Sequence, residues 1–167
     1  FLENQTHQRD GKCLLNQTGQ HLKVIMPVHV LGNMCDMEKL MTLADHHNIV
    51  VVEDATEALG SYCNGKHAGS WGVMSVFSFN GNKIISTGGG GVLVTNDQNH
   101  ARRAKHLSTQ SKVDPETYYH DEIGFNYRLV NVLAAIGVAQ MEQLPDFIQK
   151  KKSIDHFYRT HLHNVGD

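Results

Sequence analysis

The run Ile-Val-Val-Val-Glu-Asp at residues 49–54 decides the fold class of this chain of 167 residues. Its uninterrupted β-branched residues are typical of a strand covered on both faces, as in a parallel sheet flanked by helices. Similar apolar runs alternate with segments of helical periodicity, the strands expected at 24–30, 73–79 and 91–95 and the helices at 36–44, 98–107, 131–144 and 147–162. This alternation predicts an α/β fold with a mostly parallel sheet.

The composition excludes several classes of function. A net charge of −2 predicts neither nucleic-acid binding nor attraction to an anionic membrane. The cysteines Cys13, Cys35 and Cys63 are odd in number and form no C-x-x-C pair, which argues against a disulfide framework or a zinc knuckle. They favour the reducing cytoplasm. We find no signal-peptide pattern and no apolar run long enough to span a bilayer.

Asp54 closes the strand at 49–54 and is the first candidate for chemistry. Ligands of open α/β sheets lie beyond the carboxyl ends of the strands. A buried carboxylate there needs a cationic partner, and a protonated pyridine nitrogen is one such partner. A pyridine ring held in this way can accept electrons from a neighbouring carbanion. The structural alternative is that Asp54 caps the turn that follows, a position that aspartate favours.

Lys83 follows the strand expected at 73–79 and is the second candidate. A lysine inside a site can form a Schiff base with an aldehyde, although a single loop lysine is more often only solvated. Ser78 lies five residues earlier, where its hydroxyl could bind a phosphate oxygen. The glycine run at 88–91 lets the backbone approach a ligand closely or turn sharply. It precedes a strand, so it is neither a Walker loop nor a Rossmann fingerprint.

The histidines and one lysine run favour ordinary structural roles. The twelve histidines have no regular spacing, so we expect no metal site. His29, at the end of the first expected strand, could line the site or serve as a buried structural histidine. The three lysines at 150–152 are expected on a solvated helix face.

In combination these motifs resemble those of the sugar-nucleotide aminotransferases known as the DegT/DnrJ/EryC1/StrS family. The resemblance covers roughly residues 22–160, with matching motifs at 27–32, 53–60, 77–83, 87–91, 124–129 and 134–144. It implies a pyridoxal phosphate (PLP) enzyme of the aspartate-aminotransferase fold, type I. The expected architecture is part of the three-layer α/β/α large domain of that fold.

The resemblance also implies roles for individual residues. Lys83 would form the Schiff base with PLP and move protons, Asp54 would pair with the pyridine nitrogen, and Ser78 would bind the phosphate. Glu57 would lie near the cofactor ring. Asn126 would reach the phosphate in a neighbouring subunit, which makes the active site a property of a homodimer.

Within the family, the chain is most similar to the enzymes that aminate C4 of a UDP-linked 4-keto-6-deoxy-N-acetylhexosamine. The motifs at 54–57 and 80–83 and the Asp-Gly-Lys at 10–12 carry this similarity. Such enzymes supply legionaminic acid and related sugars of lipopolysaccharide and other surface polysaccharides. Glutamate is the expected amino donor and 2-oxoglutarate the product. Related sugar 3-dehydratases carry histidine in place of the lysine, so Lys83 argues against that activity.

The resemblance further implies that residues 1–167 are an incomplete cofactor-binding large domain, a piece that could be inactive by itself. We expect a polar loop or hairpin at 1–21, a sheet core with the cofactor site at 22–128, and a long helical segment at 129–163. An N-terminal arm would precede the chain, and a small C-terminal domain would follow it.

Overall fold

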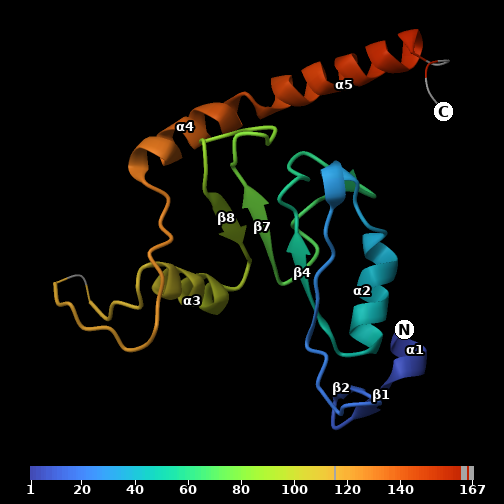
Figure 1. Cartoon of the computed structure of the whole chain (residues 1–167), viewed down its shortest axis with the longest axis vertical. Coiled ribbons are helices and arrows are strands. Elements are labelled where there is room, and N and C mark those ends of the chain that lie inside the picture. The colour runs from blue at the N-terminus through green and yellow to red at the C-terminus, as the bar shows by residue number, and fades with distance from the viewer. Residues whose placement is uncertain (115, 163–164, 166–167) are drawn as a thin grey trace.

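The computed structural model describes residues 1–114, 116–162 and 165 of the chain. Its centre is a four-stranded sheet, and the strand order is β3-β4-β7-β8 (Figure 1). The strands are β3 (Val24–Ile25), β4 (Val50–Asp54), β7 (Met74–Ser78) and β8 (Gly91–Val94). β3, β4 and β7 run parallel, whereas β8 pairs antiparallel with β7. The expectation of a mostly parallel α/β sheet is therefore confirmed.

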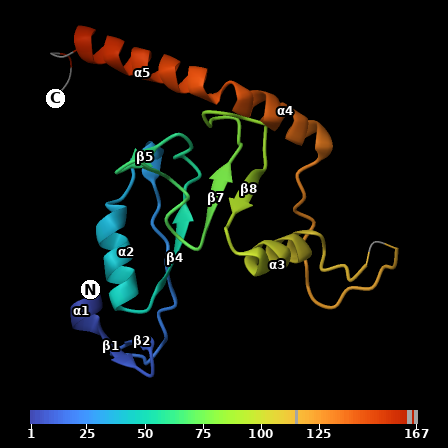
Figure 2. The same cartoon turned by 180° about the vertical axis from the view of Figure 1, so that it is seen from behind.

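The first helix of the core is α2 (Met37–His46), which begins where the sequence predicts a cap. The Asp36 carboxylate accepts a hydrogen bond from the Lys39 N–H at 3.3 Å, and this bond satisfies one of the free donors of the first turn. Met37 and Ala44 are fully buried and pack with Val51 of β4. Figures 1 and 2 show α2 alongside β4, on the side away from β7.

In the residues described after β8, the chain forms three helices. α3 (Gln98–Ser108) follows β8, and a long loop then leads to α4 (Asn131–Glu142) and α5 (Leu144–His161). Pro145 lies in the first turn of α5, where its missing N–H costs nothing, so the proline separates the two helices as predicted. Both helices cross the end of the sheet toward which β4 and β7 point (Figure 1). The boundary expected at residue 163 lies outside the described residues.

A hairpin occupies much of the polar N-terminal segment. After the short helix α1 (Leu2–Gln5), β1 (Thr6–Arg9) pairs antiparallel with β2 (Lys12–Leu15) through a turn at Asp10 and Gly11. Both turn residues have positive φ, 51° and 70°, as a tight two-residue hairpin turn requires. The Gln8 side chain donates to the backbone oxygen of His47 at 2.9 Å, which attaches the hairpin to the end of α2.

Two details differ from the sequence expectations. The strand expected at 24–30 is regular only over β3, because Pro27 has no N–H to give to a ladder. The segment still follows β4, since Asp54 N donates to Pro27 O at 2.9 Å and His29 N donates to Asp54 O at 3.0 Å. A second hairpin, β5 (Tyr62–Cys63) with β6 (Lys66–His67), was not predicted.

Candidate active site

A cavity of about 360 Å³ lies beyond the carboxyl ends of β4 and β7, the place where open α/β sheets bind ligands. Lys83, Glu57 and Ser78 share its wall, as does Lys151 of α5. A larger hollow of about 690 Å³ lies beside α2 but contains none of the predicted site residues. The smaller cavity is therefore the candidate site.

Lys83 is held at the cavity wall by a carboxylate. Its Nζ donates to Glu57 Oε1 at 3.1 Å, and the Lys83 side chain is only 15% exposed. Glu57 Oε2 accepts a second hydrogen bond, at 2.7 Å, from the N–H of Leu31. The Leu31 N–H and, after it, the Lys83 ammonium hold the pKa of Glu57 below its ordinary value. Glu57 is thus a negatively charged partner for Lys83. The resemblance to the family separately implies that Glu57 lies near the cofactor ring.

A tight turn after β7 brings Lys83 back toward the strand end. The Lys83 N–H donates to the Asn80 backbone oxygen at 3.1 Å, and the Asn80 N–H donates to Ser78 Oγ at 3.2 Å. Asparagine and glycine in the Asn-Gly-Asn sequence at 80–82 suit such a turn. Ser78 and Lys83 consequently line one cavity although five residues separate them.

Asp54 lies at the end of β4, beside this cavity rather than on its wall. Its Oδ1 accepts a hydrogen bond from the Thr56 N–H at 3.1 Å, so the capping role left open by the sequence is present. In the described part of the chain, Oδ2 has no hydrogen-bond partner. Asp54 can therefore cap the turn with one oxygen and offer the other to a cation.

Glu53, the residue before Asp54, is buried and fully hydrogen-bonded. Oε1 accepts from the N–H groups of Trp71 at 2.7 Å and Gly72 at 2.8 Å. Oε2 accepts from the Gly69 N–H at 2.8 Å and from His29 Nε2 at 3.1 Å. Burial works against ionisation, but these donors, led by Gly72, keep the pKa of Glu53 below its ordinary value. Sequence analysis did not single out this carboxylate.

His29 is buried with Glu53 and does not face the cavity. Its exposed fraction is 1%. Nδ1 accepts a long hydrogen bond from the Cys35 N–H at 3.4 Å, so the contact with Glu53 assigns the proton to Nε2. The geometry gives His29 the structural role that the sequence left open, and it offers no support for contact with substrate.

Asn126 does not share the cavity with Lys83. It is exposed and forms an isolated bridge with Thr109, just after α3. Its segment runs between the long loop and α4, along the edge of the molecule (Figure 1). Its expected contact with the phosphate of a neighbouring subunit stays a prediction.

A family model for the DegT/DnrJ/EryC1/StrS aminotransferases matches residues 4–167. The chain belongs to this family. It is 42% identical over 163 residues to GDP-perosamine synthase of Escherichia coli O157:H7, with 98% of this chain and 45% of that protein covered. It is 36% identical over 129 residues to UDP-4-amino-4,6-dideoxy-N-acetyl-beta-L-altrosamine transaminase of Campylobacter jejuni, with 76% of this chain and 34% of that protein covered.

Solved structures of the aminotransferase family have the same fold. Helicobacter pylori PseC, an aminotransferase involved in pseudaminic acid biosynthesis, superposes with a TM-score of 0.80 at 28% identity. The superposition covers 85% of this chain and 39% of PseC. The chain thus spans less than half the length of the relatives it matches.

The residues of the site fit PLP, the cofactor on which this aminotransferase family depends. Lys83 supplies an amine on the cavity wall, and Ser78 supplies a hydroxyl on the same wall. Asp54 Oδ2 is available to a ring nitrogen. An amine, a hydroxyl and a carboxylate are the groups that an aldehyde, a phosphate and a protonated pyridine respectively require.

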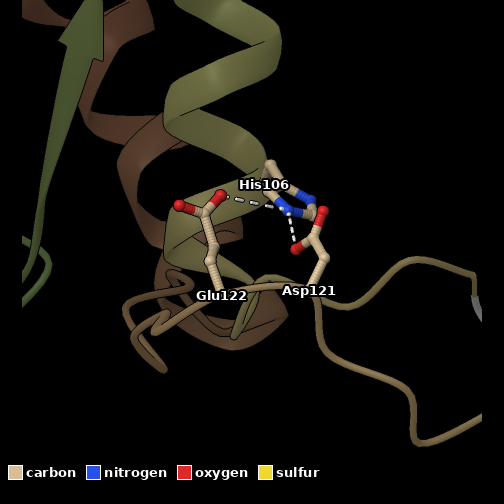
Figure 3. Close-up of side chains that lie close together, drawn as sticks. All are labelled: His106, Asp121 and Glu122. Atoms are coloured by element: carbon tan, nitrogen blue, oxygen red, sulfur yellow. Dashed lines mark hydrogen bonds and ion pairs between the residues drawn. The ribbon is translucent and has the colours of Figure 1, made fainter.

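A second cluster of ionisable side chains connects α3 to the loop between α3 and α4 (Figure 3). His106 Nε2 lies 2.7 Å from Asp121 Oδ1 and 3.5 Å from Glu122 Oε1. The three could hold a metal by composition. However, Arg103 binds both Glu122 oxygens, one of them at 2.7 Å through Nη2. We interpret the cluster as an ion-pair network that fastens the loop.

Within the described residues, no helix combines the length and the apolar character that a membrane span needs.

Proposed function

We propose that the complete protein is a PLP-dependent aminotransferase acting on C4 of a UDP-linked 4-keto-6-deoxy-N-acetylhexosamine, with glutamate as the amino donor. The observation that carries this proposal is the position of Lys83. Its amine stands on a cavity wall at the carboxyl end of the sheet, together with Ser78 and beside Asp54. This arrangement supports the proposal, because a PLP enzyme needs an amine, a hydroxyl and a carboxylate near one another.

We assign each of these residues a proposed task in the reaction. PLP would supply an aldehyde that condenses with amines and a ring that takes up electrons. Lys83 Nζ would hold the cofactor through its aldehyde and would move a proton at the carbon that gains or loses nitrogen. Asp54 Oδ2 would keep the ring nitrogen protonated, and Ser78 Oγ would bind the phosphate. Glu57 Oε1, 3.1 Å from Nζ, holds the amine at the cavity wall.

A second candidate substrate is a GDP-linked 4-keto-6-deoxyhexose. It is favoured by the 42% identity to a GDP-perosamine synthase, a higher value than the 36% identity to the UDP-sugar transaminase. The two candidates share the 4-keto-6-deoxy sugar and differ in the nucleotide and the N-acetyl group. The chemistry at Lys83 is the same for both.

The experiment that tests the proposal supplies both nucleotide sugars to the complete protein with PLP and glutamate. The expected result is an amino sugar product from the UDP-linked substrate, with one 2-oxoglutarate formed per product. A product from the GDP-linked sugar alone would replace the first candidate by the second. A deoxygenated product, or none from either sugar, would overturn the proposed aminotransferase.

We also propose that the enzyme is a cytoplasmic homodimer in which Asn126 completes the site of the partner. Asn126 is exposed and lies outside the cavity of its own Lys83. The adjoining helix α4 supports a partner surface, because Val132 is 71% and Val138 61% exposed. Exposed apolar clusters of this kind mark interaction sites.

A further inference from the structure

The end of β4 carries two adjacent carboxylates with opposite surroundings. Successive side chains of a strand point to opposite faces, so Glu53 and Asp54 cannot face the same space. Asp54 is partly exposed beside the cavity, whereas Glu53 is 0% exposed. The proposed reaction uses Asp54 but gives no task to Glu53. A buried carboxylate that takes no part in the proposed reaction needs an explanation, because transferring it out of water costs free energy.

Glu53 joins three segments that are distant in the sequence. His29 belongs to the segment after β3 and lies 24 residues before Glu53. Gly69, Trp71 and Gly72 belong to the loop before β7 and lie 16, 18 and 19 residues after it. Glu53 itself is the second-last residue of β4. The carboxylate therefore bonds to the neighbouring segment on each side of its own strand.

The loop at 69–72 is shaped to reach this carboxylate. A Cβ atom on Gly72 would lie 2.4 Å from the backbone oxygen of Val51, a distance that no side chain tolerates. Gly69 has φ of +80°, and a Cβ there would lie 2.4 Å from the ring of Phe77. Both glycines let the loop backbone come close enough to β4 to donate hydrogen bonds.

The segments joined by Glu53 carry the groups of the cofactor site. β4 ends at Asp54, and β7 ends at Ser78, with Asp54 paired to Val76 in the parallel register. The loop at 69–72 leads directly into β7, so a shift of this loop would move Ser78 relative to Asp54. Val28, next to His29, bridges to Asp54 on the other side.

We propose that Glu53 is a positioning residue, whose buried carboxylate clamps the end of β4 to the loop that begins β7, so that Asp54 and Ser78 hold one cofactor together. His29 is the side-chain partner of this clamp. The inference rests on the proposed function, because it assigns Asp54 and Ser78 to PLP. An amide cannot replace the carboxylate, since the oxygens of Glu53 accept four hydrogen bonds and the NH₂ of glutamine would face N–H donors.

The test compares Glu53→Gln with Met37→Ala in the complete protein. Met37 is equally buried but packs between α2 and β4, away from the cavity, so it controls for loss of stability. The readouts are the dissociation constant of PLP and the pH at which the visible band of the bound cofactor titrates. For Glu53→Gln we expect at least a tenfold weaker PLP affinity and a shifted titration. For Met37→Ala we expect neither change.

His29 provides a second pair of variants if Glu53→Gln does not fold. His29→Leu removes the side-chain donor to Glu53, whereas His29→Gln keeps an N–H donor. We expect His29→Leu to weaken PLP binding and His29→Gln to restore most of it. Hydrogen exchange at the amides of residues 69–72 should rise in Glu53→Gln and in His29→Leu.

Lower thermal stability in Glu53→Gln with unchanged PLP affinity and unchanged titration would overturn the inference and leave Glu53 a purely structural residue. A wild-type protein that binds no PLP would instead contradict the proposed function. In that case the exchange at residues 69–72 still decides the clamp, because it is measured without cofactor. Unchanged exchange in both variants would refute the clamp whatever the cofactor does.

Discussion

The two halves of the chain differ in how far their apolar side chains are buried. Of the buried residues that the structure describes, nearly all lie at or before Thr87, including Met37, Val51 and Ile85. In the second half, none of the residues of α3, α4 and α5 is buried. The first half therefore packs around its own core and presents Lys83. The second half exposes apolar surface that, by our proposal, a second subunit and the rest of the protein cover.

The largest expected effect is a loss of activity when Lys83, which the first half presents, is removed. Lys83→Ala should reduce transamination by at least about 10²–10⁴-fold, the range that a positioned acid–base group contributes. Thermal stability should change little, because Lys83 is held mainly by one ion pair with Glu57. Steady-state rates and a melting curve of the complete protein check both parts. Normal turnover by Lys83→Ala would remove Lys83 from the mechanism.

A mixing experiment tests whether the second half of one subunit serves the first half of another. Asn126→Ala and Lys83→Ala should each be inactive as pure dimers. Hybrid dimers contain one site with an intact Lys83 from one subunit and an intact Asn126 from the other, so mixing after mild dissociation should restore activity. Two variants of Lys83, mixed in the same way, are the matched control. If mixing restores nothing while hybrids form, Asn126 acts within its own subunit.

Glu53→Gln should cost the first half far more stability than a change to an exposed carboxylate. Each N–H donor left without an acceptor should cost about 1–3 kcal/mol, because it stays buried. Urea unfolding followed by circular dichroism measures the loss. Asp36→Asn, which changes an exposed capping carboxylate, should cost much less. Equal losses in the two variants would show that the four hydrogen bonds of Glu53 do little for stability.

The pH dependence of the free energy of unfolding tests the ionised state of the buried Glu53 carboxylate. The pKa of Glu53 is lower in the folded chain than in the unfolded chain, so its contribution is complete above the unfolded pKa of about 4.3. The contribution is lost as the pH falls through the lower, folded pKa. The stability difference between wild type and Glu53→Gln should therefore be constant near neutral pH and shrink in acid. A difference that grows below pH about 4 would contradict the lowered pKa.

The smallest effect on folding is expected on α4. Val132→Asp should change the stability of a subunit by no more than about 0.5 kcal/mol, because the side chain is exposed. It should weaken dimerisation, because a charge would enter an apolar interface. Sedimentation at several concentrations measures this, with Lys150→Asp on α5 as an exposed control. A Val132→Asp dimer as tight as wild type would remove α4 from the interface.

Local signals explain why much of the fold could be predicted. The β-branched run at 49–54 is β4, Asp36 caps α2, and Pro145 opens α5, since each depends on its immediate neighbours. The β5–β6 hairpin was missed although Asn64-Gly65 is a strong turn signal, and both residues have positive φ. The antiparallel direction of β8 could not be predicted, because it depends on how the chain returns after the glycine run.

Only part of the candidate site could likewise be predicted from the sequence. Lys83, Ser78 and Asp54 could be selected because their motifs resemble those of a family. The hydrogen-bond donors to Glu53 could not be predicted from the sequence. They lie 16 to 24 residues away, and most are backbone N–H groups without a sequence signature. The capping bond from Thr56 to Asp54 shows that a structural role and a proposed cofactor role can coexist in one carboxylate.

The most direct test of the central claim is borohydride reduction of the complete protein in the presence of PLP, followed by peptide mass spectrometry. We predict a single reduced PLP adduct on Lys83, absent from Lys83→Ala. An adduct on another lysine, such as Lys151 of the same cavity, with Lys83 unmodified would contradict it.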